Sequence, residues 1–161
     1  DPHHVMLGVP DRVTSSLFGL TLKKKLMRRL ALEAVRRSSI KTANVSQGVR
    51  SLSGGNQQKV AIAQALDCKP RLLLLEEPTR SVDIQSKREI YRLLREFVQA
   101  GNVAIMFCTE VLEVYEAADR AHVITDGLMS PPIVVHDYAH VERLATDITH
   151  MERHNRASAM S

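Results

Sequence analysis

The sequence has little of what would mark a secreted, metal-binding or membrane-spanning protein. Its two cysteines, Cys68 and Cys108, lack CxxC spacing and a neighbouring His suited to a metal. We interpret them as free, buried thiols in a reducing compartment. No apolar run approaches the roughly 20 residues of a transmembrane helix, and no signal-peptide pattern precedes residue 30. These absences predict a cytoplasmic protein.

A large charge imbalance is also missing. The net charge of +4 comes from 22 Lys and Arg against 18 Asp and Glu, which is too small to argue for nucleic acid. The 161 residues, 44% of them apolar, suit one globular domain. The histidines at positions 3, 4, 136 and 140 fit no standard metal-site spacing, so we interpret them as surface residues. The chain begins Asp1-Pro2 without Met, from which we expect that an N-terminal portion precedes it.

The N-terminal third predicts a loop followed by a basic helix. Breakers such as Pro10 and Gly19 indicate a loop over residues 1–22, with a short strand at residues 5–9. From Lys23, apolar residues recur at helical spacing until about Ser38. Seven basic residues lie outside this apolar face, and two interpretations remain open for them: a solvated surface, or contact with lipid headgroups or RNA.

Helix and strand patterns alternate along the rest of the chain. Expected helices cover residues 56–66, 84–100, 112–118 and 141–153, with a frayed tail beyond. Expected strands cover residues 71–75, 103–108, 121–125 and 133–135, with a turn at Asp126-Gly127. The unbroken apolar run at 72–75 predicts a parallel strand that is covered on both faces. The alternation predicts an α/β fold with a mainly parallel sheet.

Two segments carry recognisable chemistry. In LSGGNQQK, residues 52–59, a Ser and two glycines stand at the expected entrance of a helix. Backbone N–H groups can approach a phosphate there, and the helix dipole favours the negative charge. In LLLLEEPT, residues 72–79, a strand delivers two carboxylates, Glu76 and Glu77, at its carboxyl end. Nucleotide hydrolases use this arrangement to hold Mg²⁺ and position water.

With RSVD at residues 80–83, these segments resemble, in order, the signature motif, Walker B motif and D-loop of ATP-binding-cassette (ABC) ATPases. The resemblance covers about residues 9–128, and the GGNQQK form is similar to subunits that import monosaccharides. It implies a partial P-loop NTPase fold with a mainly parallel sheet flanked by helices. The implied divisions are a loop and helical-subdomain remnant (1–50), the signature helix with the distal half of the ATPase core (51–130), and a C-terminal strand, helix and tail (131–161).

The resemblance also implies roles for individual residues. Ser53, Gly54 and Gly55 would contact the γ-phosphate of an ATP held by an opposite cassette. Gln57 is a further cofactor-binding residue of the signature. Glu77 would be the catalytic carboxylate that orients water. Glu76 would be the Mg²⁺ ligand. Asp83 would couple the two sites of the dimer, and Thr109 takes the position of a catalytic switch residue.

The sequence departs from the family pattern at several of these positions. No GxxxxGK[ST] phosphate loop occurs in it. The family's Walker B Asp is Glu76, its switch His is Thr109, and its D-loop Gly is Ser81. Its Q-loop Gln aligns with Asp11. Because the phosphate loop is missing, we expect the chain alone neither to bind Mg-ATP tightly nor to hydrolyse it. A Thr also cannot act as a hydrogen-bond switch near neutral pH as His can.

These features predict an ATP-dependent, Mg²⁺-dependent subunit of an ABC sugar importer, peripheral on the inner face of the membrane. The implied partners are a second cassette, transmembrane permease subunits and, indirectly, a periplasmic sugar-binding protein, with no nucleic acid. One alternative is a non-catalytic partner that supplies only the signature surface to another ATPase. Another is an ABC ATPase of DNA repair or translation, which the lack of long coiled-coil heptads disfavours.

Overall fold

The computed structural model describes residues 17–159, and their side chains over residues 25–157. It divides into two compact units, one ending at Met106 and one beginning at Phe107. The strand expected at residues 5–9 lies outside the described residues. No helix among residues 17–159 has the length and apolar character needed to cross a membrane.

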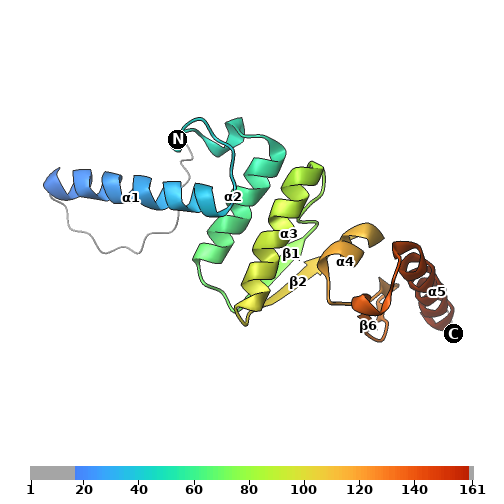
Figure 1. Ribbon diagram of the computed structural model, residues 1–161. Coiled ribbons are helices and arrows are strands. Elements are labelled where there is room, and N and C mark those ends of the chain that lie inside the picture. The colour runs from blue at the N-terminus through green and yellow to red at the C-terminus, as the bar shows by residue number, and fades with distance from the viewer. Residues whose placement is uncertain (1–16, 160–161) are drawn as a thin grey trace. The chain divides into compact units, whose positions relative to one another are not determined.

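The first unit combines three helices with two strands (Figure 1). In chain order these are α1 (Leu17–Arg37), a 3-10 turn (Val49–Ser51), α2 (Gly54–Asp67), β1 (Leu72–Glu76), α3 (Ile84–Gln99) and β2 (Val103–Phe107). The loop predicted for residues 17–22 was wrong, because α1 begins at Leu17. A single glycine, Gly19, costs a helix only about 1 kcal/mol, which the rest of α1 outweighs. The expected end of this helix near Ser38 is confirmed.

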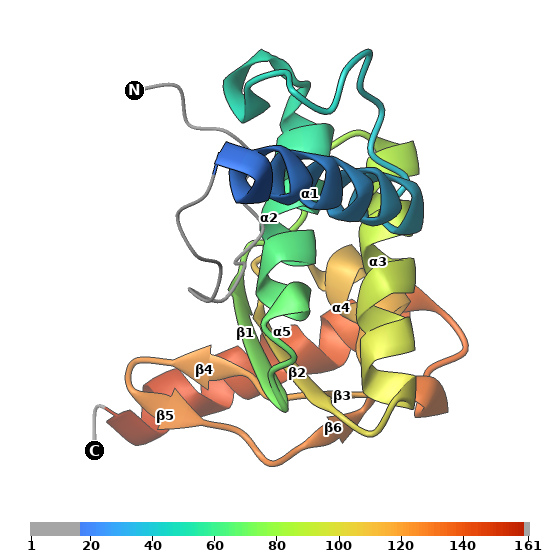
Figure 2. The same cartoon turned by 90° about the vertical axis from the view of Figure 1, so that its left-hand side faces the viewer.

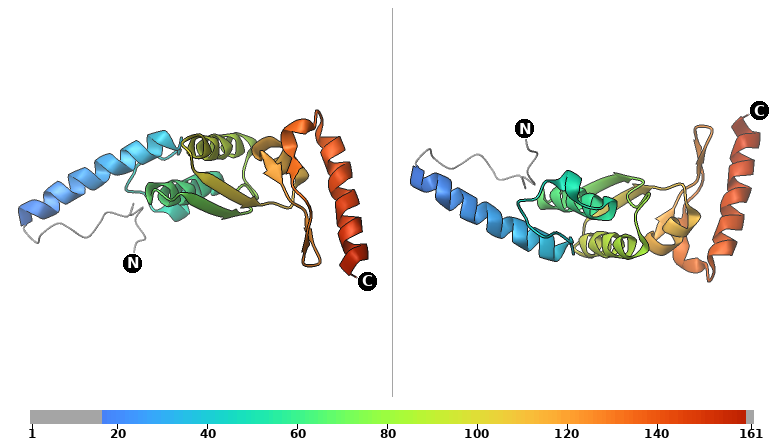
Figure 3. Two further views of the ribbon diagram at one scale, coloured as in Figure 1. Left: turned by 90° about the horizontal axis from the view of Figure 1, so that it is seen from below. Right: turned by 90° about the horizontal axis from the view of Figure 1, so that it is seen from above.

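Strands β1 and β2 form a parallel pair, as the alternating pattern predicted. Both begin side by side, where Val103 N donates to Arg71 O at 2.9 Å, and α3 makes the crossover between them. Helices α2 and α3 lie together against one face of the pair (Figure 3). Their shared core is the buried cluster of Ile62, Leu73, Ile90 and Leu94. The sheet and the two helices therefore make one two-layer unit.

The opposite face of the sheet is apolar and bare. Successive side chains of a strand point to opposite faces, and Leu72 and Leu74 are 50% and 68% exposed on the face away from the helices. Val103, Ile105 and Phe107 of β2 are likewise 54–55% exposed. The prediction that β1 is covered on both faces was wrong for the described residues, which cover only one face.

A buried ion pair ties α2 to α3. The Lys59 side chain is 1% exposed, and its Nζ donates to Glu89 Oε2 at 2.5 Å and to Ser39 O at 2.8 Å. A charge removed from water is costly unless it is paired and hydrogen-bonded, and both conditions are met here. Arg92 of α3 also donates to Arg37 O at 3.1 Å. The signature helix, the helix after the D-loop and the turn after α1 are therefore fastened together.

The second unit has two helices and two short antiparallel ladders (Figure 2). The helices are α4 (Val111–Ala117) and α5 (Val141–Ala159), with a 3-10 turn at Val135–Asp137. The ladders pair β3 (Arg120–Ala121) with β6 (Ile133–Val134) and β4 (Ile124–Thr125) with β5 (Leu128–Met129). Helix α5 continues to Ala159, so the frayed tail expected beyond Arg153 was wrong for the described residues.

The strand predicted at residues 121–125 is interrupted at Val123. This residue turns into the core, 8% exposed, and its N–H donates to Ser130 Oγ at 2.9 Å instead of to a strand. The predicted turn is confirmed, with Asp126 and Gly127 both at positive φ, as two-residue hairpins require. Cys68 is exposed and Cys108 half-buried, so the expectation that both are buried was wrong.

Adjacent leucines of β1 test the one-sided burial of the sheet. Leu73→Ala should lower the free energy of unfolding by about 2–5 kcal/mol, because it leaves a cavity in the core. Leu74→Ala is the matched control and should change it by less than about 0.5 kcal/mol, since its side chain points to the bare face. Urea unfolding of this chain measures both. Equal losses would show that the second face is covered as well.

Candidate functional site

The entrance of α2 is where the sequence predicted it, at Ser53. Ser53 is the N-cap, with extended backbone angles, and its carbonyl accepts the first helical bond from Gln57 N at 2.9 Å. Its side chain is exposed and makes no capping bond to the helix. The first N–H groups of a helix have no intrahelical acceptor. Since Ser53 Oγ caps none of them, these N–H groups and the exposed hydroxyl are potential donors to an anion.

The two glycines of the signature have different surroundings. A methyl group added at Gly54 would meet no atom within 4 Å, so this residue opens onto free space. At Gly55 the same group would lie 2.6 Å from Ser86 Oγ and 2.7 Å from Ser86 Cβ. Gly55 is buried, and its small size allows α2 to approach α3. The sequence predicted that both glycines let a phosphate approach closely. Open space lies only at Gly54.

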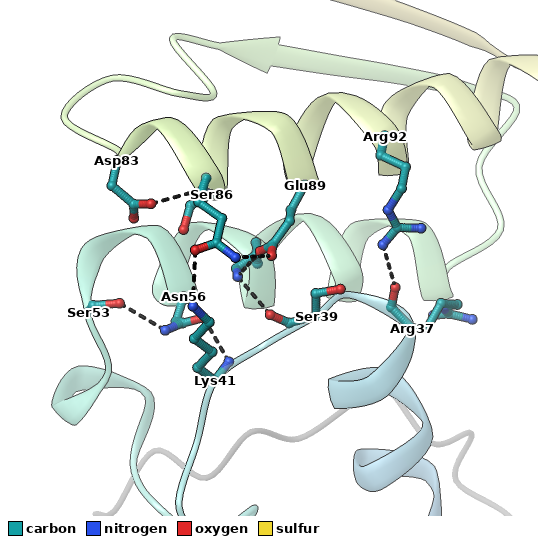
Figure 4. Close-up of polar contacts among 11 residues, drawn as sticks. Arg37, Ser39, Lys41, Ser53, Asn56, Asp83, Ser86, Glu89 and Arg92 are labelled. Carbon is teal, nitrogen blue, oxygen red and sulfur yellow. Dashed lines mark hydrogen bonds and ion pairs between the residues drawn. The ribbon is translucent and has the colours of Figure 1, made fainter.

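Asp83 caps α3, as predicted, and stands next to the signature helix. Its Oδ1 accepts from Ser86 N at 3.0 Å (Figure 4). This hydrogen bond, together with one from the Ser86 side chain, holds the pKa of the Asp83 carboxyl below its ordinary value of 3.8. A methyl group at Gly55 would also lie 3.0 Å from Asp83 Oδ2. The packing of two helix N-termini thus brings together the signature motif and the D-loop.

The predicted catalytic carboxylates stand at the carboxyl end of β1. Glu76 is the last residue of the strand and is exposed. Glu77 follows it, half-buried, with φ +44°, a left-handed angle that is uncommon for a residue with a side chain. The turn that follows is anchored by Thr79, which is 0% exposed and bonds through Oγ1 to Tyr91 OH at 3.2 Å. The backbone is held in a strained form where the carboxylates are presented, as is frequent at functional sites.

The remaining predicted residues have different surroundings. Gln57 Nε2 donates to Leu52 O at 2.8 Å, so it fastens the turn before the helix. Thr109 belongs to the second unit, where it is exposed in the bend before α4. Ser81, at the family's D-loop Gly position, has φ +57°, the left-handed form that a glycine adopts without strain. Asp11 lies outside the described residues.

Three further residues were not singled out from the sequence. Ser86 fills the space left by Gly55, Lys59 carries the buried charge, and Asn56 bonds to Ser53. The spacing Ser53-x-x-Asn56 places Asn at the third helical position, where a polar side chain can reach back to the N-cap. That spacing was the available signal for Asn56. Ser86 had none, because its role depends on a contact between two helices.

Comparison with known proteins agrees with this geometry. The family described as ABC transporter matches residues 11–80. The fold is shared with the ATP-binding cassette MJ0796 in its dimeric post-hydrolysis state bound to ADP and phosphate, at a TM-score of 0.60 and 24% identity over 77% of this chain and 50% of that one. It is also shared with cbiO1 of Clostridium perfringens, part of a cbiONQ transporter complex, at a TM-score of 0.58 and 25% identity over 71% of this chain and 45% of that one. The chain belongs to the ATP-binding-cassette transporter family and holds part of its P-loop NTPase fold.

Curated relatives place it more closely within that family. The ribose import ATP-binding protein of Bacillus licheniformis is 42% identical over 140 residues, which are 87% of this chain and 28% of that protein. The xylose import ATP-binding protein of Pseudomonas syringae pv. syringae is 40% identical over 124 residues, 76% of this chain and 24% of that protein. The chain thus spans about a quarter of the length of these relatives. The resemblance to sugar-import ATP-binding proteins inferred from GGNQQK is confirmed.

Alanine substitutions at the two signature glycines distinguish the packed position, Gly55, from the open one, Gly54. Gly55→Ala should lower the free energy of unfolding by about 1–3 kcal/mol, because α2 must move away from Ser86. Gly54→Ala should leave it unchanged or raise it by up to about 1 kcal/mol, since the position is open and helical. Thermal and urea unfolding measure both. A Gly55→Ala chain as stable as the parent would contradict the close packing of α2 on α3.

The lowered pKa of Asp83 predicts a dependence of stability on pH. Because the folded pKa lies below the unfolded one, the ionised carboxylate stabilises the fold above pH 3.8, and this contribution is lost as pH falls through the folded pKa. Asp83→Asn keeps a capping side chain but does not titrate. The difference in Tm between parent and variant should therefore stay constant above pH 3.8 and change below it. If the Tm of the two proteins fell in the same way as the pH was lowered below 3.8, the hydrogen bonds from Ser86 would not lower the pKa of Asp83.

Proposed function

We propose that this chain is the signature-bearing part of the ATP-hydrolysing subunit of an ABC importer for a sugar. The observation that carries the proposal is the entrance of α2, where a helix start without a side-chain cap, the exposed hydroxyl of Ser53 and the open space at Gly54 come together. In this proposal they bind the γ-phosphate of an ATP held by a second cassette. The sugar follows from the names of the relatives, which import ribose and xylose.

The residues present fit a phosphate better than a metal ion. The α2 entrance offers N–H and O–H donors, and the first turn of α2 contains no acidic residue. Asp83, an acid placed beside it, lies on the side of Gly55 and is held by Ser86 N–H. Among residues 17–159 no group of three or more His, Cys, Asp or Glu could hold a metal. Mg²⁺ is ordinarily bound through one or two carboxylates together with the phosphates of its nucleotide. Glu76 would be one such carboxylate, and the remaining ligands would come with ATP.

The roles of the side chains follow from where they are held. Ser53 and the N–H group of Gly54 would donate to phosphate oxygens, stabilising the charge that develops as the phosphoryl group is transferred. Glu77, fixed by its strained backbone, would orient the attacking water. Asp83 lies against Gly55, so a change at either residue reaches the other. We infer from this contact that Asp83 couples the phosphate-binding helix to the D-loop.

The bare face of the sheet supports a role within a larger assembly. Its exposed side chains are large and apolar, and isolated soluble domains rarely leave such a patch uncovered. We propose that further ATPase core covers this face in the working protein. A second cassette and transmembrane permease subunits would complete the transporter, with the subunit peripheral on the inner face of the membrane and a periplasmic sugar-binding protein acting indirectly.

A charged side chain at Gly54 tests the phosphate contact. In the complete subunit, Gly54→Asp should lower ATPase activity at least tenfold, about 1.4 kcal/mol of lost transition-state stabilisation, because it places negative charge where phosphate binds. The fold should be kept, since a Cβ atom at this position meets no atom within 4 Å. Steady-state phosphate release and circular dichroism measure the two effects. Unchanged ATPase activity and transport would remove Gly54 from the site.

A further inference from the structure

The hydroxyl group of Ser53 is held by a neighbouring side chain. Asn56, in the first turn of α2 and only 7% exposed, donates from Nδ2 to Ser53 Oγ at 2.9 Å (Figure 4). The other end of the same amide, Oδ1, accepts from the backbone N–H of Lys41 at 2.9 Å. One buried side chain therefore connects the exposed serine to the segment that follows α1.

The bond from Lys41 fixes the direction of the bond to Ser53. A backbone N–H can only donate, so the amide atom that faces it must be oxygen. The NH₂ group of Asn56 must then face Ser53 Oγ as a donor. Lys41 is itself held on α3, because its Nζ donates to Gln85 Oε1 at 3.2 Å. The orientation of the Asn56 amide is thus set by contacts outside the signature motif.

This direction decides what the serine can do. A hydroxyl group has one hydrogen to donate and two lone pairs that accept. Asn56 uses a lone pair, so the hydrogen of Ser53 remains for a different acceptor. Ser53 does not cap α2, and its side chain is exposed. Its hydrogen is therefore available to an anionic oxygen that arrives from solvent or from a partner.

We infer that Asn56 is a positioning residue that keeps the Ser53 hydroxyl in the donor state for the phosphate of the opposite ATP. The inference rests on the proposed function, since it assumes that Ser53 meets that phosphate. Asn56 does not touch the nucleotide and acts only through Ser53. An acceptor in its place would take the serine hydrogen for itself and would leave a lone pair facing the phosphate.

Asn56→Asp replaces the NH₂ donor that faces Ser53 with an acceptor in a side chain of nearly the same shape. The carboxylate keeps an oxygen for Lys41 N–H but accepts from Ser53 in place of donating to it. In the assembled transporter, purified from the membranes of the cells that make it, kcat for ATP should fall about tenfold or more. KM should stay within about twofold, because the opposite cassette supplies most of the ATP binding. Gln58→Glu adds the same charge to the same helix without touching Ser53 and should keep both constants within about twofold.

Ser53→Ala and the double variant Ser53→Ala/Asn56→Asp separate the possible results. If Asn56 acts through Ser53, kcat of the double variant should be lower than kcat of Ser53→Ala by no more than the factor that Gln58→Glu loses alone. Losses that multiply, or an Asn56→Asp protein as active as the parent, would overturn the inference while leaving the proposed function intact. Full activity in Ser53→Ala would instead overturn the phosphate contact and with it the proposed role of Ser53. Slow hydrogen exchange of the Lys41 amide, retained in Asn56→Asp, verifies that the fold is unchanged.

Discussion

The buried ammonium group of Lys59 is the interaction on which the first unit depends. It joins Glu89 on α3 to the carbonyl of Ser39 after α1, and removal of Glu89 would leave the Lys59 charge without compensation in the interior. Once α2 and α3 are held at this distance, their N-termini must meet. Gly55 then faces Ser86, and the cap of α3 at Asp83 stands beside the signature helix. The contact between signature and D-loop is thus a consequence of helix packing.

The same packing divides the signature into an inner and an outer part. Gly55, Asn56 and Lys59 face the body of the unit and are buried, whereas Ser53 and Gly54 face outward. A helix start can serve as a phosphate site only if its donors are both free of internal partners and held rigidly. The inner residues supply the rigidity, and the outer residues remain available. This division explains why one short motif needs both structural and binding residues.

Two surfaces of the chain fit the partners of the proposed assembly. Its sheet exposes apolar side chains on the face away from α2 and α3, and its helix entrance offers hydrogen-bond donors that no side chain caps. Both features fit the proposed role within a two-cassette transporter. The alternative of a non-catalytic partner uses the same outer surface, and it differs only in assigning no turnover to Glu77. The DNA-repair or translation alternative has no support among the relatives described above, which import sugars.

Local sequence determined most of the elements and several of their ends. The helix entrance at Ser53, the cap at Asp83, the turn at Asp126-Gly127 and the order of the three motifs were all readable, because caps and turns depend on neighbours within a few residues. Tertiary structure alone decided that Gly55 faces Ser86, that Asn56 bonds to Lys41 and that β1 is covered on one face only. These features join residues far apart in the chain. They depend on how α2 and α3 pack, and the periodicity of either helix leaves that packing undetermined.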